Sequence, residues 1–317
     1  MAKPNFFIIG DTICDTFLYG DVTRISAEAP VPICDVQNEI NSLGGAFNVT
    51  AHLRNLGVVT HHLTVVGDSF KEFKKKLSSV EFDEHCDHFI YEKDRKTSTK
   101  TRLISLYKNT NLYRYDYEDL DDISFKQESR IISKLKNLLK PNDCIILMDY
   151  CKGVVTESLA RKVIDLASDK SITILVDTKR DNIERFEGAN YLKPNNFEFE
   201  KIKLRACPDI KSFKSSCAAI CRKFKLGNLI VTKGKNGLSY YAHFENKVLH
   251  LPGFKVDVRE LSGAGDALIA SFAYSLINKK TVESSLEIAN FMASKFINSG
   301  PTYRLQKNDL HSSPQKK

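Results

Sequence analysis

The chain has 317 residues, of which 42% are hydrophobic and 27% charged, and its formal net charge is +8. This length suits one large α/β domain or two smaller ones, and the composition is that of a globular protein. The positive charge is compatible with an anionic substrate, although solubility explains the surplus of lysines equally well. Because no basic helix, zinc-finger spacing or RNA-binding aromatic motif accompanies the charge, we expect no nucleic-acid partner.

Cysteine usage and apolar run lengths indicate the cellular compartment. The sequence has eight cysteines but no CxxC pair and no cysteine–histidine spacing typical of zinc sites. Several cysteines, such as Cys144, lie in apolar stretches, where a thiol behaves as a small hydrophobic group. The apolar run at 6–9 is too short for a signal peptide, and none approaches the roughly 20 residues that span a bilayer. We therefore expect a reduced, cytoplasmic protein without a membrane segment.

Short apolar runs alternate with helical patterns along the chain. Strands are expected at 6–11, 61–68, 143–150, 172–178, 190–195 and 228–234, and helices at 46–57, 129–140, 156–170, 215–227 and 266–277. This alternation predicts βαβ crossovers and a mostly parallel sheet covered by helices on both faces. Because ligands bind at the carboxyl ends of such strands, the polar residues that end them are candidates for a site.

Two segments, at about 16–40 and 90–117, do not follow this alternation. The first is rich in proline, and the second predicts two strands of β-branched and aromatic residues around a turn at Lys108–Asn111. We expect them to form a small sheet that projects from the main one and serves as a lid or a dimer contact. The tail at 308–317 is expected to be disordered.

The stretch "GAGD" at Gly263–Asp266 precedes a long apolar helix. Backbone N–H groups of Gly263, Ala264 and Gly265 would lie at the positive end of the helix dipole, where they can bind an anion. Asp266 in the first turn would stay ionised there and could take a proton from a hydroxyl that attacks phosphorus. An ordinary helix start with a carboxylate in its first turn is the alternative.

Two further stretches carry polar residues suited to a polyol. Gly44 and Gly45 precede a helix that carries Asn48, whose amide can both donate and accept. Asp11 and Asp15 follow the first strand and are spaced so that both can face the mouth of the sheet. A plain loop-to-helix junction and turn-capping aspartates are the alternatives.

Two strand ends suit a nucleotide and its metal. Asn195 and Glu198 are three residues apart, so they share a face if a helix begins there, and such a pair suits hydrated Mg²⁺. A capping arrangement would explain the same pair. Thr232, Gly234 and Gly237 predict a tight loop against a nucleotide or, alternatively, a β-hairpin turn.

Together "GGAFN", "KPNNFE" and "LSGAGDALIASF" resemble the signatures of the PfkB, or ribokinase-like, family of carbohydrate kinases. The resemblance implies one kinase domain over 1–317, a three-layer αβα sandwich with a small β lid. It also implies transfer of the γ-phosphoryl of ATP to a sugar hydroxyl with Mg²⁺, and a homodimer formed through the lid. Asp266 becomes the base, Glu198 a magnesium residue acting through water, and Asn290 a residue near the adenine.

A narrower likeness concerns the substrate. "RISAEAPVP" and "DYCKG" are similar to the kinase module of bacterial heptose enzymes, which phosphorylate D-glycero-D-manno-heptose 7-phosphate at the anomeric oxygen. Lys179 and Arg180, just after a strand end, are the candidates for binding the substrate phosphate. The chain departs from the family at Glu260 and Ser262, and it has "NTN" where the heptose kinases carry paired glutamines. A kinase for an unphosphorylated sugar and a non-catalytic sugar or nucleotide sensor are the alternatives.

Overall fold

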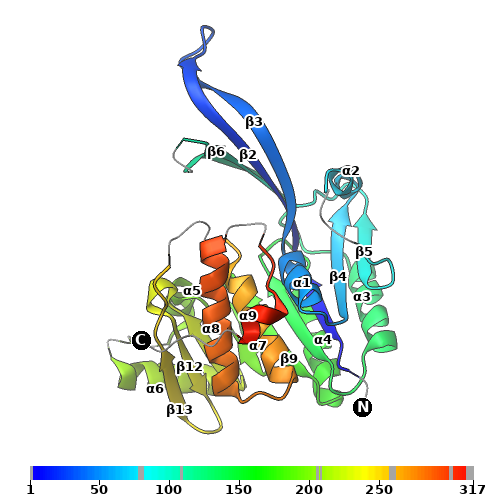
Figure 1. The fold of residues 1–317 in the computed structure, drawn as a ribbon. Coiled ribbons are helices and arrows are strands. Elements are labelled where there is room, and N and C mark those ends of the chain that lie inside the picture. Colours follow the sequence, from blue (N-terminus) through cyan, green and yellow to red (C-terminus); the bar gives the residue numbers. More distant parts are fainter. Residues whose placement is uncertain are drawn as a thin grey trace.

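Buried apolar strands form a nine-stranded sheet at the centre of the fold (Figure 1). The computed structural model describes residues 3–77, 82–107, 110–204, 207, 209–256, 262–299 and 303–311. The strand order is β13-β12-β11-β10-β9-β8-β1-β4-β5, and all neighbouring pairs are parallel except β11–β12 and β12–β13, which are antiparallel. The strands are β1 (Phe6–Gly10), β4 (Thr60–Gly67), β5 (Asp87–Glu92), β8 (Cys144–Asp149), β9 (Thr173–Thr178), β10 (Tyr191–Leu192), β11 (Asn228–Thr232), β12 (Leu238–Ala242) and β13 (Lys247–Leu251).

Helices cover both faces of this sheet because its strands are apolar on both sides. In β1, Phe7 and Ile9 enter one core, which includes α3, α4, α5 and α6, while Phe6 and Ile8 enter the other, with α1, α7 and α8. The result is the three-layer arrangement expected from the sequence. The helices are α1 (Ala46–Asn55), α2 (Ser69–Lys75), α3 (Phe125–Leu138), α4 (Glu157–Asp169), α5 (Asn196–Ile202), α6 (Ile210–Lys223), α7 (Ala264–Ile277), α8 (Val282–Ser299) and α9 (Lys307–His311).

A second, four-stranded sheet projects from the carboxyl edge of the main sheet (Figure 1). Its order is β3-β2-β6-β7, and we call it the lid. Its strands are β2 (Thr12–Ile25), β3 (Pro32–Gly45), β6 (Thr99–Ser105) and β7 (Asn111–Tyr117). Both off-pattern segments thus meet in one small sheet, as the sequence predicts, although Ile90–Glu92 belong to the main sheet through β5.

Most expected elements are present. Thr156 caps α4, since its side chain accepts a hydrogen bond from the N–H of Leu159. The sequence reading missed β5 as a strand of the main sheet. The tail was predicted to be disordered from 308, but Lys307–His311 form a short helix, and buried Asp309 of that helix contacts Lys295. The tip of the predicted turn, Lys108 and Asn109, lies outside the described residues, as does Glu260.

Candidate active site

A cavity of about 420 Å³ lies at the carboxyl edge of the main sheet, against the base of the lid. It is lined by many of the residues predicted from the sequence, namely Asp15, Gly44, Gly45, Asn48, Lys179, Asn195, Thr232, Gly263, Gly265 and Asp266. Other predicted residues do not line it: Asp11, Arg180, Glu198, Gly234, Gly237, Ala264 and Asn290. A larger groove of about 920 Å³, between β5 and α3, contains none of the predicted residues.

Asp266 is a buried acid of this cavity, with only 5% of its surface exposed. Asn48 Nδ2 donates a hydrogen bond to its Oδ2 over 2.8 Å, and the Tyr150 hydroxyl donates to its Oδ1. Burial raises the pKa of Asp266 to about 6, although both hydrogen bonds act in the opposite direction. At this pKa the carboxyl group is still mostly ionised at neutral pH, as expected from the sequence, although burial has a larger effect on the pKa than the groups that favour the charged form.

Gly263 allows the side chain of Asn48 to approach the start of α7 closely. It is the N-cap residue with φ of 97°, in the left-handed region, and Asp266 falls in the first turn as predicted. A Cβ atom on Gly263 would lie 2.8 Å from Asn48 Nδ2, the atom that holds the carboxylate. Gly263 and Gly265 line the cavity, and the first N–H groups of a helix have no partner within the helix. This arrangement can bind an anion beside a buried base.

Asp11 was predicted to bind the sugar, but its carboxylate is occupied by the main chain. It accepts hydrogen bonds from the N–H groups of Tyr150, Lys152 and Val154 over 2.7, 3.1 and 3.0 Å. Burial and the nearby charge of Asp149 raise its pKa to about 6. Asp11 thus fixes the loop after β8, which carries Tyr150 to Asp266, and has a positioning role.

Asn195 and Glu198 form a capping box at the start of α5. Glu198 Oε1 accepts from Asn195 Nδ2 and Lys179 Nζ, over 2.7 and 2.8 Å, and Oε2 accepts from the N–H of Asn195. The capping alternative is therefore correct, and only Asn195 of the pair lines the cavity. Glu198 instead holds Lys179 at the cavity wall, where it is half-exposed.

Asp177 and Lys193 form a buried ion pair beside the start of α7, with Asp177 Oδ2 2.9 Å from Lys193 Nζ. Among the described residues, Asp177 Oδ1 accepts no hydrogen bond, although Lys179 Nζ lies 3.9 Å away. A Cβ atom on Gly265 would lie 3.4 Å from Lys193 Nζ, so this ammonium group is adjacent to the helix start. A cation and an unsatisfied carboxylate oxygen thus face the place where an anion can bind.

The predicted nucleotide loop is only partly in the cavity. Thr232 lines it and pairs with Asn195 through an isolated bridge, which brings the ends of β10 and β11 together. Gly237 closes the hairpin from β11 to β12, because a Cβ there would lie 2.1 Å from the carbonyl oxygen of Leu251. Asn290 donates to the carbonyl of Pro252 over 2.8 Å. Gly237 and Asn290 therefore have structural contacts in this chain.

Arg180 was predicted to bind a substrate phosphate, but it points elsewhere. Its Nε donates to Asp149 Oδ2 over 2.7 Å, and Asp149 is buried. Asp15, in contrast, lines the cavity and pairs with Arg102 of the lid over 2.6 Å. Gly44 makes room for it, because a Cβ on Gly44 would lie 2.1 Å from Asp15 Oδ2.

Several cavity residues were missed by sequence reasoning: Tyr150, Asp177, Lys193, Lys100, Arg102 and Arg114. The first three directly follow or end a buried strand, so the strand-end argument could have found them. The lid cations could be found only from the pairing of β6 with β7, where Arg102 lies opposite Arg114.

This geometry agrees with comparisons to known proteins. The family model for pfkB family carbohydrate kinases matches residues 3–307. The chain belongs to this family. It is 34% identical over 293 residues to the bifunctional protein HldE of Aliarcobacter butzleri, covering 92% of this chain. It is 31% identical over 290 residues to HldE of Sulfurimonas denitrificans, again covering 92% of this chain. The chain spans 60% of the length of both relatives.

Solved structures of the pfkB family share the fold. Phosphofructokinase-2 from Escherichia coli, in complex with substrates and products, superposes with a TM-score of 0.79 at 14% identity, covering 98% of each chain. Ribokinase from Arabidopsis thaliana, complexed with ribose and ATP, gives a TM-score of 0.72 at 15% identity, also over 98% of each chain. The fold is therefore the ribokinase-like α/β fold expected from the sequence. Of the described helices, none has both the length and the apolar character needed to cross a bilayer.

Proposed function

We propose that this carbohydrate kinase transfers the γ-phosphoryl of ATP to a hydroxyl of a phosphorylated sugar. The observation that carries the proposal is Asp266, buried in the cavity at the first turn of α7 and held there by Asn48 and Tyr150. Asp266 takes the proton of the sugar hydroxyl as its oxygen bonds to the γ-phosphorus. The bond from that phosphorus to the β–γ bridging oxygen breaks, and ADP leaves with the electron pair.

The wall beside Asp266 is suited to the charge that develops on the transferred group. In this proposal the N–H groups of Gly263, Ala264 and Gly265 at the N-terminus of α7 are the anion hole, and the presence of Gly263 and Gly265 in the cavity wall supports it. Lys193 adds a fixed positive charge beside Gly265. Asn195 and Thr232 line the same wall, which supports their predicted place on the nucleotide side.

Mg²⁺, when bound with ATP, would neutralise charge on the nucleotide phosphates. The residues present fit such an ion, because buried Asp177 Oδ1 accepts no hydrogen bond from any described residue and Asn195, whose amide oxygen can accept more than the one bond from the N–H of Glu198, lines the same cavity. Glu198, the predicted magnesium residue, would act only through its neighbours, since both of its oxygens already accept hydrogen bonds.

For the substrate we propose D-glycero-D-manno-heptose 7-phosphate, phosphorylated at its anomeric oxygen. The HldE relatives, at 31–34% identity, support this choice. So does the cavity, which has six basic side chains and three acidic ones.

The eight free cysteines support the prediction of a cytoplasmic protein.

The test is ADP release with heptose 7-phosphate, fructose 6-phosphate, and free fructose and ribose. We expect activity with a phosphorylated sugar, and a fall in kcat of about 10²–10⁴-fold in Asp266→Asn with nucleotide binding retained. Activity confined to free sugars would show that the substrate is an unphosphorylated sugar. Activity of Asp266→Asn within about tenfold of wild type would refute the role of the base.

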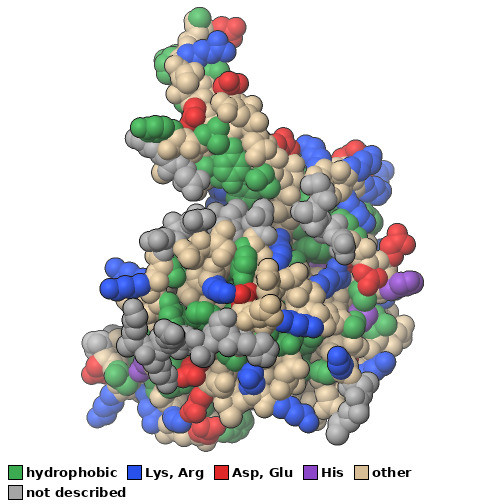
Figure 2. All heavy atoms as spheres, viewed as in Figure 1, with side chains coloured by type: hydrophobic (Ala, Val, Ile, Leu, Met, Phe, Trp, Pro, Cys, Tyr) green, Lys and Arg blue, Asp and Glu red, His purple; other side chains and the backbone are tan. Residues whose placement is uncertain are grey.

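We also propose that the protein forms a homodimer through its lid. Figure 2 shows hydrophobic side chains gathered on the lid, and Leu112, Tyr113, Tyr115 and Tyr117 of β7 are exposed. Burying such side chains against a second lid would stabilise both copies. Sedimentation of the wild type and of a Tyr113→Ser, Tyr115→Ser variant tests this. A monomeric wild type would contradict it.

A further inference from the structure

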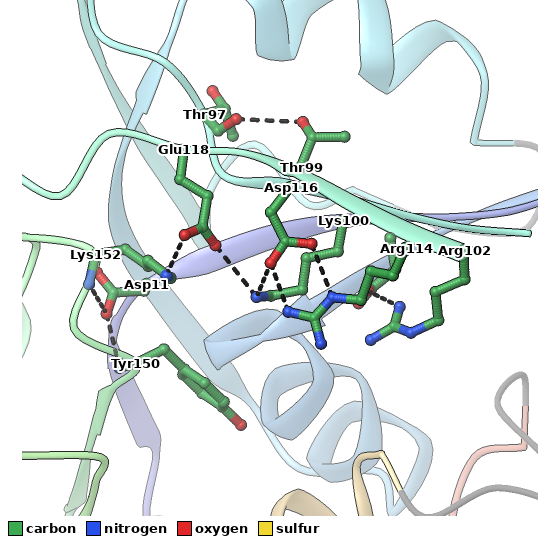
Figure 3. Close-up of polar contacts among 11 residues, drawn as sticks. Asp11, Thr97, Thr99, Lys100, Arg102, Arg114, Asp116, Glu118, Tyr150 and Lys152 are labelled. Atoms are coloured by element: carbon green, nitrogen blue, oxygen red, sulfur yellow. Dashed lines mark hydrogen bonds and ion pairs between the residues drawn. The ribbon is translucent and has the colours of Figure 1, made fainter. Parts of the chain in front are cut away.

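Six basic side chains line the cavity that contains Asp266. Two follow strands of the main sheet, three lie on the lid, and the sixth belongs to neither sheet: Lys179 and Lys193, then Lys100, Arg102 and Arg114, and finally Arg304. Figure 3 shows Lys100 of the lid between Asp116 and Glu118, 3.2 Å from each. The guanidinium groups of the lid suit the phosphate that the proposed sugar carries. Arg304, in contrast, comes from the C-terminal segment after α8.

The residue after Arg304 fastens this segment to α1. Leu305 is fully buried, and its N–H donates to His52 Nδ1 over 3.4 Å. Its carbonyl accepts a hydrogen bond from Asn55 Nδ2 over 2.7 Å. Both His52 and Asn55 belong to α1, the helix that also carries Asn48 to Asp266. The backbone at Arg304 is therefore fixed relative to the base.

The residue before Arg304 is held by a second anchor. The Tyr303 hydroxyl donates to Asp309 Oδ2, and the same oxygen accepts from the N–H of Gln306 over 2.9 Å. Asp309 is buried and also contacts Lys295 of α8. With both of its neighbours held, Arg304 is presented to the cavity at a defined place.

A chain of contacts leads from the start of α7 to Arg304. A Cβ atom on Gly263 would lie 2.8 Å from the ring of Phe296. Phe296 packs edge-on against His52, with ring centroids 5.5 Å apart, and His52 accepts the hydrogen bond from Leu305. Gly263, Phe296 and Arg304 all line the cavity. Arg304 therefore belongs to the part of the wall that contains the N-cap of α7.

The charge of Arg304 lies close to the base. Burial lowers the pKa of Arg304, and the negative charge of Asp266 acts in the opposite direction. Burial and the charge of Arg304 together hold the pKa of His52 well below its usual range, so this neighbour stays neutral. Arg304 Nη1 donates to the carbonyl of Tyr303 over 3.1 Å, and a guanidinium group carries five N–H donors in a planar fork.

We propose that Arg304 is a further catalytic residue, whose guanidinium group binds the phosphoryl group as it passes from ATP to the sugar. The proposal rests on the proposed kinase function and adds a residue to its site. Negative charge is spread over the oxygens of the group in transfer, and a cation held in place beforehand stabilises that charge without reorganisation. Lys193 approaches the first turn of α7 at Gly265, and Arg304 approaches it from the side of Phe296. The guanidinium group stays protonated throughout, so it neither gives nor takes a proton.

The experiment compares Arg304→Ala with the matched control Arg222→Ala, an exposed arginine of α6 outside the cavity. Arg304→Ala should lower kcat with heptose 7-phosphate about 10²–10³-fold, the loss typical of one fixed donor to developing charge, with both KM values nearly unchanged. Arg304→Lys should retain part of kcat, because it keeps the charge without the planar fork. Guanidinium ion, added below the concentrations that unfold the protein, should restore part of kcat in Arg304→Ala and leave Arg222→Ala unchanged.

The pH profile gives a second measurement that a merely structural role would not change. A positive charge near Asp266 favours the ionised carboxylate, so its removal should raise the pKa of Asp266. Because activity needs the ionised base, the acid limb of kcat/KM in Arg304→Ala should move to higher pH. The same limb in Arg222→Ala should stay in place.

The outcomes separate the role of Arg304 from the kinase function. If wild type phosphorylates a sugar and kcat of Arg304→Ala stays within about threefold of it, Arg304 is not catalytic and the kinase stands. A low kcat that guanidinium ion does not raise, with a lower temperature of thermal unfolding and an unmoved acid limb, would assign Arg304 to stability instead. A wild type inactive with every sugar would overturn the kinase function itself.

Discussion

The two cationic walls of the cavity differ in how their charges are held. On the main-sheet side, Lys193 is 3% exposed and locked to Asp177, so water and ligands can do little to move it. On the lid side, Arg114 is half-exposed and paired with an acid of its own strand. A buried pair suits the part of the reaction that never changes, the phosphoryl group of ATP. An exchangeable pair suits the part that distinguishes one substrate from another.

Among the variants that test the difference between the two walls, loss of Lys193 should have the largest effect on activity. Lys193→Met removes a charge beside the anion hole, so we expect kcat to fall about 10²–10³-fold with KM for the sugar phosphate nearly unchanged. Steady-state kinetics with heptose 7-phosphate would measure both. If instead KM for the sugar phosphate rose and kcat held, the two walls would have the same role.

Stability needs a separate control, because removing one partner of a buried pair costs about 3–5 kcal/mol. Lys193→Met combined with Asp177→Asn removes the lone buried charge and should recover part of the free energy of unfolding. The double variant should still have a low kcat. Recovery of kcat would show that the single variant had lost activity through folding.

A methyl group at Gly44 should disturb only the lid side. In Gly44→Ala the new Cβ would lie 2.1 Å from Asp15 Oδ2, so the carboxylate must move away from Arg102. We expect KM for the sugar phosphate to rise about tenfold, because a charge-assisted hydrogen bond is lost, with KM for ATP constant. Equal increases in KM for the sugar phosphate and in KM for ATP would mean that a change on the lid side also alters the main-sheet side.

The smallest expected effect is a shift in pH dependence from Tyr150→Phe. The Tyr150 hydroxyl donates to ionised Asp266 and so favours the charged form, and its removal should raise the pKa of Asp266 above about 6. Activity needs the ionised base, so it is lost as pH falls through this pKa. The acid limb of kcat/KM should therefore move to higher pH by about one unit.

The substrate phosphate titrates in the same way for wild type and for Tyr150→Phe. The difference between their two profiles of kcat/KM against pH therefore reports the change in the pKa of Asp266. A shift to lower pH, or none, would show that Tyr150 does not stabilise the charged carboxylate. Arg114→Gln should leave the acid limb in place, because Arg114 contacts Asp116 rather than Asp266.

Short apolar runs predicted six of the nine strands of the main sheet, and many residues of the cavity follow from the polar ends of those strands, which meet at one edge. Asp266, Asn48, Gly44, Gly45, Gly263 and Gly265 line one cavity, as their positions after strand ends and at helix starts suggest, whereas Gly234 and Gly237 do not line it. The prediction for Asp11 was wrong, since nothing local showed that the loop after β8 would fold back and donate three N–H groups to it. The lid cations depend on pairing among strands far apart in sequence, so only the fold brings Asp15, Arg102 and Arg114 together.

The two hydrogen bonds to Asp266 also bear on how the enzyme avoids wasting ATP. A carboxylate has about four accepting positions, and Asn48 and Tyr150 fill one on each oxygen. A water molecule that reached Asp266 would have to donate to one of the remaining accepting positions of the carboxylate, with no other group to hold it there. A sugar fixed at its far end by the lid is delivered to those positions. Hydrolysis of ATP in the absence of sugar should therefore be slow compared with phosphoryl transfer to the sugar. Weakening the lid contacts should lower the ratio of the transfer rate to the hydrolysis rate.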